Sequence, residues 1–491
     1  MSTSLAGENR LLIDGKLLPA RSGKQYPNIN PATEQTIGHV ADAGPDDMDA
    51  AIAAARRAFD TTDWSTNHAF RLHCLTQLRD ALNAAKDHLR PLIAAETGAP
   101  MGICGAGGPQ CDVPIGFGDW LLGFLPGYRW ERDIGEATIL GVKSRRVVCK
   151  EAVGVVGAIT PWNVPLQINL AKCTPALAAG CTVVLKAAPD TPWSATEFGR
   201  IVAEHTDIPA GVFNVITASD PREVGEQLVR DPRVDMISFT GSTQVGRNIM
   251  SMAGATVKKV FLELGGKSAN VMLEDADLQK GLLSALAVCF HAGQGCAIAT
   301  RLLIPRKRQA EVEEILKQYF GFIAYGDPSS DQQIMGPLVN RRQMERVLDY
   351  IRIGKEEGAR VLLGGGRPAH LPQGFYVEPT VFVDVRNDMR IAQEEIFGPV
   401  LAVIAYDTED EALAIANDSI FGLSGGVWSA DGARALAFAK RMRTGTVNVN
   451  GGNFYGADAP FGGYRQSGIG REMGPEGFEE YLETKTVAIG L

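Results

Sequence analysis

The chain lacks the sequence features of several large protein classes. No apolar run approaches the length that crosses a bilayer, and the opening MSTSLAGENRLLIDGK has neither the basic start nor the apolar stretch of a secretory signal. Lysine and arginine total 48 against 57 acidic residues, so the net charge of -9 disfavours a nucleic-acid backbone as partner. We therefore expect a cytoplasmic protein that binds neither membrane nor nucleic acid.

Paired metal ligands are also missing. The 8 cysteines include no C-x-x-C pair, and the 7 histidines show no H-x-H or H-x-x-x-H spacing. We expect no metal site and no disulfide framework. Most cysteines in such a chain are small buried side chains, so a catalytic role for one of them needs support from its surroundings.

What is present is the composition of a large globular protein, with 491 residues of which 45% are hydrophobic. Helical spacing of apolar residues predicts amphipathic helices over 45–59 and 69–96, then a glycine-rich loop over 96–113 and an apolar helix over 113–127. From about residue 150, short β-branched runs alternate with helical stretches, which is typical of a parallel doubly wound sheet. A second alternating set after 265–278 predicts a second α/β domain.

Two segments alternate polar and apolar residues like exposed strands. ATILGVKSRRVVCKEAV (137–153) resembles an antiparallel ribbon, and YLETKTVAIGL (481–491) a final strand. Exposed strand edges tend to pair. These segments form either an oligomer contact or an edge hairpin that pairs only within its own subunit.

Cys296, in GQGCAIAT, is a candidate nucleophile. The glycines before it let a ligand approach the backbone closely, and we expect a helix to follow it. A helix N-terminus favours the thiolate and lets the Cys296 amide donate to an oxyanion.

Polar residues at predicted strand ends support a site. Glu263 closes the apolar strand of FLELGG, where a lone carboxylate is either functional with a raised pKa or bonded to a neighbouring amide. Asn163 in TPWNVP and Lys186 in LKAAPD follow two strands whose carboxyl ends bind ligands in such sheets. Asn163 could donate to an oxyanion, and Lys186 could hold a ribose hydroxyl or phosphate. GSTQVG (241–246) opens a helix whose free amides suit a pyrophosphate.

These motifs resemble the NAD(P)-dependent aldehyde dehydrogenase superfamily over almost the whole chain. NPATEQTIGHV, TPWNVP, LKAAPDTP, FTGSTQVG, LELGGKSANV, GQGC, EEIFGPV and PFGGYRQSGIGRE occur in the family's order. The resemblance implies that Cys296 attacks an aldehyde, that Asn163 and the Cys296 amide hold the oxyanion, and that Glu263 activates water against the thioester. It links Lys172 and Glu472 to proton exit.

The resemblance also implies an NAD site. For Trp162, Phe397 and Gly225 the alternative interpretation is ordinary packing. Many NAD-preferring relatives carry Glu where this chain has Pro189, so NADP is possible, and whether Asp190 substitutes is open. The residues implied to bind NAD are Ile159, Trp162, Lys186, Gly225, Gly241, Ser242, Gly246, Leu264, Glu395 and Phe397.

The expected fold is α/β and aldehyde-dehydrogenase-like, with a Rossmann-type cofactor domain, an α/β catalytic domain and a β-hairpin oligomerisation arm. Because dimers and tetramers are typical of the family, the resemblance implies that the chain forms a homodimer or a homotetramer. The boundaries implied are 1–126 with 150–262 for the cofactor domain, 263–464 for the catalytic domain, and 127–149 with 465–491 for the arm.

Three other functions are weighed against this one. A CoA-acylating relative typically lacks the Glu263 base, and a non-enzymatic relative would have lost the nucleophile or the cofactor residues. An unrelated cysteine hydrolase needs a histidine beside Cys296, and His291 is the nearest in sequence.

The substrate is expected to be an uncharged aliphatic or aromatic aldehyde, with a semialdehyde as the alternative. The segment VPIGFGDWLLGF and three aromatic residues match mouth positions of the family, and Val164 stands where some relatives have a larger ring. An apolar funnel offers no partner for a charged substrate group. The three aromatic residues are Phe290, Tyr455 and Phe461.

Overall fold

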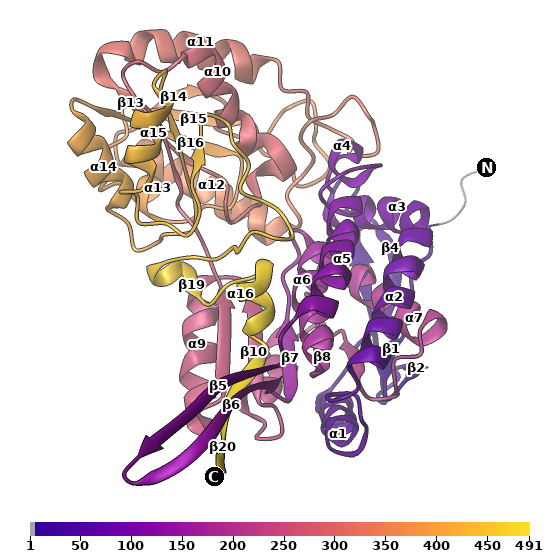
Figure 1. The fold of residues 1–491 in the computed structure, drawn as a ribbon. Helices are drawn as coiled ribbons and strands as arrows, with labels where there is room; N and C mark the ends of the chain where they lie inside the picture. The colour runs from indigo at the N-terminus through magenta and orange to yellow at the C-terminus, as the bar shows by residue number, and fades with distance from the viewer. Residues whose placement is uncertain (1–4) are drawn as a thin grey trace.

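The structure is a computed structural model that describes residues 5–491. Two α/β bodies lie one above the other in Figure 1, and a long two-stranded hairpin projects from the lower one. Within the described residues, no helix is both long enough and apolar enough to span a membrane.

The first sheet has eight strands in the order β19-β11-β10-β7-β8-β9-β1-β2. Its five central strands are parallel, which confirms the predicted doubly wound sheet. The chain runs outward from β7 through β8 and β9, then returns to the other side of β7 with β10. Ligands bind at such a reversal. The strands are β1 (Leu11–Ile13), β2 (Lys16–Leu18), β7 (Val155–Ile159), β8 (Thr182–Lys186), β9 (Phe213–Ile216), β10 (Met236–Thr240), β11 (Lys259–Glu263) and β19 (Gly468–Ile469).

Helices from several parts of the chain pack against this sheet. They bury apolar faces such as that of Met48, Ile52 and Ala55 on α1 against strands whose residues are almost all buried. Pro165 starts α6, and Ser242 caps α9 by accepting from the Val245 amide. The helices are α1 (Pro45–Thr61), α6 (Pro165–Ala179), α7 (Trp193–His205), α8 (Pro221–Arg230) and α9 (Thr243–Ala253).

The second sheet has seven strands in the order β14-β15-β16-β13-β12-β17-β18, parallel except for β14. It matches the predicted second alternating set. Its strands are β12 (Ala269–Met272), β13 (Arg301–Pro305), β14 (Arg360–Leu363), β15 (Thr380–Val383), β16 (Val400–Tyr406), β17 (Gly425–Trp428) and β18 (Asn448–Val449). Its helices include α10 (Leu278–Gly281), α11 (Gln309–Gly321), α12 (Arg341–Glu356), α13 (Arg390–Gln393), α14 (Glu409–Asn417) and α15 (Gly432–Ala439).

The projecting ribbon is a three-stranded antiparallel sheet in the order β20-β6-β5. Strands β5 (Glu131–Ile139) and β6 (Val142–Ala152) form the hairpin, and β20 (Leu482–Gly490) pairs along β6. The predicted ribbon and final strand therefore pair with each other within one chain. A separate hairpin joins β3 (Gln25–Ile29) and β4 (Thr36–Ala41).

Two helix predictions were wrong in detail. The expected helix over 69–96 is two helices, α2 (His68–Ala84) and α3 (Lys86–Thr97), which meet at Ala85. The Ala85 amide donates to the Ala81 and Leu82 carbonyls, so the last turn of α2 is tightened and the helix ends there. Because the chain is divided at this point, the leucines of both helices can be buried. The expected loop after residue 96 contains the short helix α4 (Met101–Cys104), whereas the predicted apolar helix is present as α5 (Asp112–Phe124).

Candidate active site

A single cavity of about 1350 Å³ opens at the carboxyl ends of β7, β8, β10 and β11 and reaches the segment that holds Cys296. It brings together most of the predicted site residues, although they are spread over more than 300 positions of the sequence. Lys172 and Gly246 lie behind its wall. The predicted residues that line it are Ile159, Trp162, Asn163, Lys186, Gly225, Gly241, Ser242, Leu264, Glu263, Cys296, Glu395, Phe397 and Glu472.

The prediction of a helix after Cys296 is wrong. Residues 294–300 form a non-helical turn that leads directly into β13, so the chain has no room for a helix before it joins the sheet. A 3-10 helix, Leu282–Gly293, precedes the turn instead. Within residues 5–491 the Cys296 amide donates no hydrogen bond, so it is free to donate to a ligand in the cavity.

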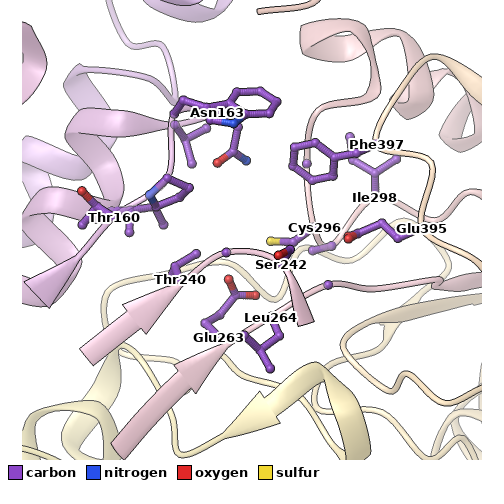
Figure 2. Close-up of a pocket in the computed structure, with 18 of the residues that line it drawn as sticks. Thr160, Asn163, Thr240, Ser242, Glu263, Leu264, Cys296, Ile298, Glu395 and Phe397 are labelled. Atoms are coloured by element: carbon purple, nitrogen blue, oxygen red, sulfur yellow. The ribbon is translucent and has the colours of Figure 1, made fainter. Parts of the chain in front are cut away.

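A network of amides fixes this turn. Gln294 donates from its side chain to the His291 carbonyl at 3.0 Å and accepts from the Val339 amide at 2.9 Å. Asn163 donates to the Gln294 carbonyl at 2.9 Å, and buried Gln110 donates to the Asn163 carbonyl at 2.9 Å. Asn163 therefore faces Cys296 from the opposite wall (Figure 2). The sequence reading missed Gln110 and Gln294, although a glutamine between two glycines was a visible signal.

The thiol of Cys296 lies beside the carboxyl of Glu263 (Figure 2). Burial, followed by the nearby carboxylates of Glu263 and Glu395, raises the pKa of the thiol well above its ordinary value. The thiol is therefore protonated at neutral pH in this state. Forming the thiolate requires that its proton move to a base in the cavity.

Glu263 is the last residue of β11 and sits opposite Thr240 at the end of β10. It is 1% exposed, and its Oε1 has no hydrogen-bond partner among the described residues. Burial, together with the charge of Glu472, raises the pKa of Glu263 to about 8. The reading of Glu263 as a strand-end residue bonded to a neighbouring amide does not account for this free oxygen, whereas a proton-accepting role does.

Behind Glu263 lies a buried ion pair. Lys172 Nζ is 2.7 Å from Glu472 Oε1, and the two side chains are 0% and 3% exposed. Lys172 also approaches the Ser238 hydroxyl at 3.5 Å and lies over the Phe261 ring at 4.5 Å. Glu472 lines the cavity, so the pair connects the cavity to the interior beneath the first sheet.

One end of the cavity carries Glu395 and Phe397. Glu395 accepts from the Gly266 amide at 2.9 Å, and burial raises the pKa of its carboxyl to about 7. Phe397 meets Trp162 edge to face at 5.4 Å between ring centroids. A Cβ at Gly265 would stand 2.4 Å from Glu395, so this glycine leaves room for the carboxylate.

The other end is built around Lys186, which pairs with Ile159 across β7 and β8. Burial lowers the pKa of Lys186 to about 8. Pro189 lines the cavity without offering a carboxylate, and Asp190 accepts from Asn340 at 2.8 Å. Asp190 is thus already engaged by a protein partner on one of its oxygens.

Between these ends, the N-terminus of α9 faces the cavity at Gly241 and Ser242. A Cβ at Gly241 would lie 2.5 Å from the Phe239 ring, and one at Gly246 would lie 2.6 Å from Leu264. The two glycines therefore let the backbone pack directly against Phe239 and Leu264, where a larger side chain would clash. Unpaired amides at a helix N-terminus favour a phosphate group, so the cavity fits a dinucleotide between Lys186 and Glu395.

Of the predicted mouth residues, Val164, Tyr455 and Phe461 line the cavity. Phe290 is 50% exposed and lies outside its lining. The segment 113–124 lies in α5 and lines a small neighbouring cavity that shares two residues with the main one, Gln167 and Met473.

His291 does not stand beside the thiol. It is buried outside the cavity lining, and burial lowers the pKa of its imidazole to about 4. A neutral ring behind the wall cannot serve as the paired base that a cysteine hydrolase needs. Among residues 5–491, no group of three or more metal-ligating side chains is arranged to hold an ion.

Known proteins resemble this chain in sequence and in structure. A model described as "Aldehyde dehydrogenase family" matches residues 18–487. A 3-succinoylsemialdehyde-pyridine dehydrogenase from a Pseudomonas species is 43% identical over 97% of both chains. A betaine aldehyde dehydrogenase from Bacillus subtilis is 38% identical, over 97% of this chain and 96% of the relative.

Two solved structures are similarly close. An aldehyde dehydrogenase from Mycobacterium tuberculosis with NAD+ has a TM-score of 0.93 and 41% identity, covering 98% of this chain and 97% of that one. A mutant of aldehyde dehydrogenase C from Pseudomonas syringae, solved with NAD+ and octanal, has a TM-score of 0.92 and 41% identity, covering 98% and 96%.

Proposed function

Because the chain belongs to the aldehyde dehydrogenase family and oxidises an aldehyde to a carboxylic acid, we propose that Cys296 is its nucleophile and Glu263 its general base. One observation carries this assignment. Within a single cavity, a buried carboxyl with a free oxygen lies beside the one cysteine that lines it. Such a pair can move a proton and form a covalent intermediate.

The cofactor is NAD, which solved relatives of this fold hold. We propose that Lys186 contacts its adenosine ribose, that Ser242 and the Gly241 amide face its pyrophosphate, and that Glu395 and Phe397 hold its nicotinamide end. Ile159, Trp162, Gly225, Gly246 and Leu264 complete the proposed set. NADP is the second candidate because Pro189 presents no carboxylate that would repel a 2′-phosphate.

In the proposed reaction, Glu263 takes the thiol proton and the Cys296 sulfur bonds to the aldehyde carbon. The carbonyl electron pair moves onto oxygen, where Asn163 Nδ2 and the Cys296 amide hold the alkoxide. Bound NAD accepts the hydride from that carbon, and the carbonyl re-forms as a thioester. Glu263 then takes a proton from water, whose oxygen attacks the thioester carbon. The carbon–sulfur bond breaks, which releases the carboxylic acid and restores Cys296.

Glu263 accepts a proton at each half of this cycle, so it must release one between them. The Lys172–Glu472 pair stands directly behind it and is the route we propose. Its two charges are fixed at 2.7 Å and excluded from bulk water. A buried pair in that position can relay a proton from Glu263 toward the interior without contact with bulk water.

The test follows reduced nicotinamide by absorbance after mixing enzyme, NAD and aldehyde. Wild-type enzyme should turn over, and Cys296→Ala should form no reduced cofactor. Glu263→Gln should slow both the first burst of reduced cofactor and the steady turnover, because Glu263 takes a proton in each half of the proposed cycle. Cys149→Ala is the control, because Cys149 lies on β6 away from the cavity. Full steady turnover in Glu263→Gln would remove the base from this mechanism.

For the substrate, we propose an uncharged aliphatic or aromatic aldehyde. The cavity wall near Cys296 includes Val164, Phe454, Tyr455 and Phe461, which offer no charge to pair with a substrate ion. The relative solved with octanal supports such a substrate, whereas the relative named for a pyridine semialdehyde supports the alternative, a semialdehyde. A kinetic panel in which a carboxylate-bearing semialdehyde or betaine aldehyde has the highest kcat/KM would contradict it.

We also propose that the chain forms a homodimer or homotetramer through its arm. The arm exposes apolar side chains at the hairpin tip and along β20, and solvent-exposed apolar surface of this kind favours association. Leu140 is 99% exposed, and Ile139, Val142, Val487 and Ile489 are 41–61% exposed. We also propose the domain boundaries given by the resemblance: a cofactor domain over 1–126 and 150–262, a catalytic domain over 263–464, and an arm over 127–149 and 465–491. Light scattering should show that Leu140→Asp lowers the assembled mass if the tip is buried between subunits.

A further inference from the structure

Part of the cavity wall near Cys296 is formed by aromatic side chains. Tyr455 lies 5.5 Å from Phe117 and 6.4 Å from Phe461, measured between ring centroids. Phe461 in turn stacks on Phe454 at 5.9 Å. The hydroxyl of Tyr455 is therefore the single hydrogen-bonding group that this aromatic cluster presents.

That hydroxyl has no partner. Its oxygen is buried, and no described residue accepts from it or donates to it. A buried hydroxyl without a hydrogen bond is unfavourable, so such groups are rare unless a ligand completes them. Tyr455 lines the cavity, which places a ligand within its reach.

The hydroxyl is also close to the reacting atoms. Burial, followed by the charges of Glu472, Cys296 and Glu263, raises the pKa of Tyr455 well above its ordinary value. The phenol stays protonated at any pH at which the enzyme works, so it is available as a donor. It cannot supply a charge to a substrate ion.

We propose that the Tyr455 hydroxyl donates a hydrogen bond to an uncharged acceptor oxygen that the substrate carries close to its aldehyde carbon. The preferred substrate class is then an aldehyde with an ether, keto or hydroxyl oxygen near the aldehyde group and an apolar remainder. This rests on the proposed function and narrows its substrate class. Tyr455 acts as a specificity-determining residue, because the covalent chemistry belongs to Cys296.

The test uses two pairs of aldehydes that match in shape: methoxyacetaldehyde with butanal, and 3-methoxypropanal with pentanal. The ratio of kcat/KM for the ether to that for the alkyl member is measured in wild-type enzyme and in Tyr455→Phe. For at least one pair the ratio should fall about tenfold in Tyr455→Phe, the size expected for one hydrogen bond in a buried site. Differences in aldehyde hydration cancel in this comparison.

Tyr464→Phe is the matched control, since Tyr464 is 43% exposed and outside the cavity lining. Ratios that stay within twofold of wild type in Tyr455→Phe would overturn the proposal, as would an equal fall in Tyr464→Phe. A parallel measurement keeps the two proposals separate. Calorimetric binding of the same aldehydes to the NAD-loaded Cys296→Ala chain, with and without Tyr455→Phe, reads the hydrogen bond without turnover. If the wild-type enzyme forms no reduced cofactor but Tyr455→Phe still weakens binding of the ether aldehydes, only the proposed function is contradicted.

Discussion

Replacing either member of the buried Lys172–Glu472 pair should move the titration of Glu263, and the two replacements should move it in opposite directions. The Glu472 charge raises the pKa of Glu263 and the Lys172 charge lowers it. Lys172→Met leaves the carboxylate alone, so the pKa of Glu263 should rise above its present value of about 8. Glu472→Gln leaves the ammonium alone, so the pKa should fall below 8.

The expected size follows from the burial of the pair. A charge close to a buried carboxyl shifts its pKa by about 1–3 units, and each unit is about 1.4 kcal/mol. Either single replacement also leaves one buried charge without its partner, which costs about 3–5 kcal/mol of stability. The double replacement removes both charges, so it should be less destabilised than the two single costs added together.

The assay is steady-state kcat from pH 6 to 10 with saturating NAD and aldehyde. Glu263 accepts protons only as a carboxylate, so kcat should rise as pH passes through its pKa, with a wild-type midpoint near 8. The control is Lys150→Met, which breaks a surface pair with Glu479 at 3.0 Å and should leave the midpoint in place. Midpoints that move in the same direction for Lys172→Met and Glu472→Gln would refute the reasoning.

Three further predictions use separate features. Asn163→Ala should lower kcat about 10²–10³-fold, because one oxyanion donor is gone. Stopped-flow kinetics should show that the burst of reduced cofactor is slowed, and an undiminished burst would contradict this. Gly246→Ala should weaken NAD binding by calorimetry, since its Cβ would meet Leu264 at 2.6 Å, whereas Gly254→Ala has nothing within 4 Å and should bind normally. The pKa of Glu263 is raised to about 8 in the folded chain. Its contribution to stability is therefore complete below the unfolded pKa and is lost as pH rises through 8. In thermal melts from pH 6 to 9, the melting temperature should fall less with pH in Glu263→Gln than in the wild-type chain.

Local sequence patterns were enough to predict the parallel strands of the first sheet and the charged residues at their ends. The β-branched runs predicted β7 to β11, and a parallel sheet with helical crossovers places the ends of those strands on one edge. Glu263 and Lys186, which line the cavity, stood out in the sequence because each is a charged residue at the end of an apolar strand. The fold class and the family followed from such motifs.

Contacts between distant segments could not be read in the same way. The turn at Cys296 looked like a helix start, yet its shape is set by Gln294, whose bonds reach Asn163 and Val339. The hydrogen bond that occupies one oxygen of Asp190 comes from Asn340, which lies 150 positions away in the sequence. Phe290 is close to Cys296 in sequence but outside the cavity lining, because the chain turns sharply between them. These features follow from packing, which local propensity does not encode.

The charge balance of the cavity explains why the two halves of the proposed reaction share one base. Burial raises the pKa of Glu263 to about 8 and that of Glu395 to about 7, and it raises the pKa of the Cys296 thiol well above its ordinary value. Several buried acids cannot all ionise in one low-dielectric space, so a thiolate forms only when its proton moves to a neighbour. Glu263 is the acid that lies beside the thiol. In the proposed reaction it then releases that proton toward Glu472 before it takes one from water, so we expect the pair behind it to control the pH dependence of turnover.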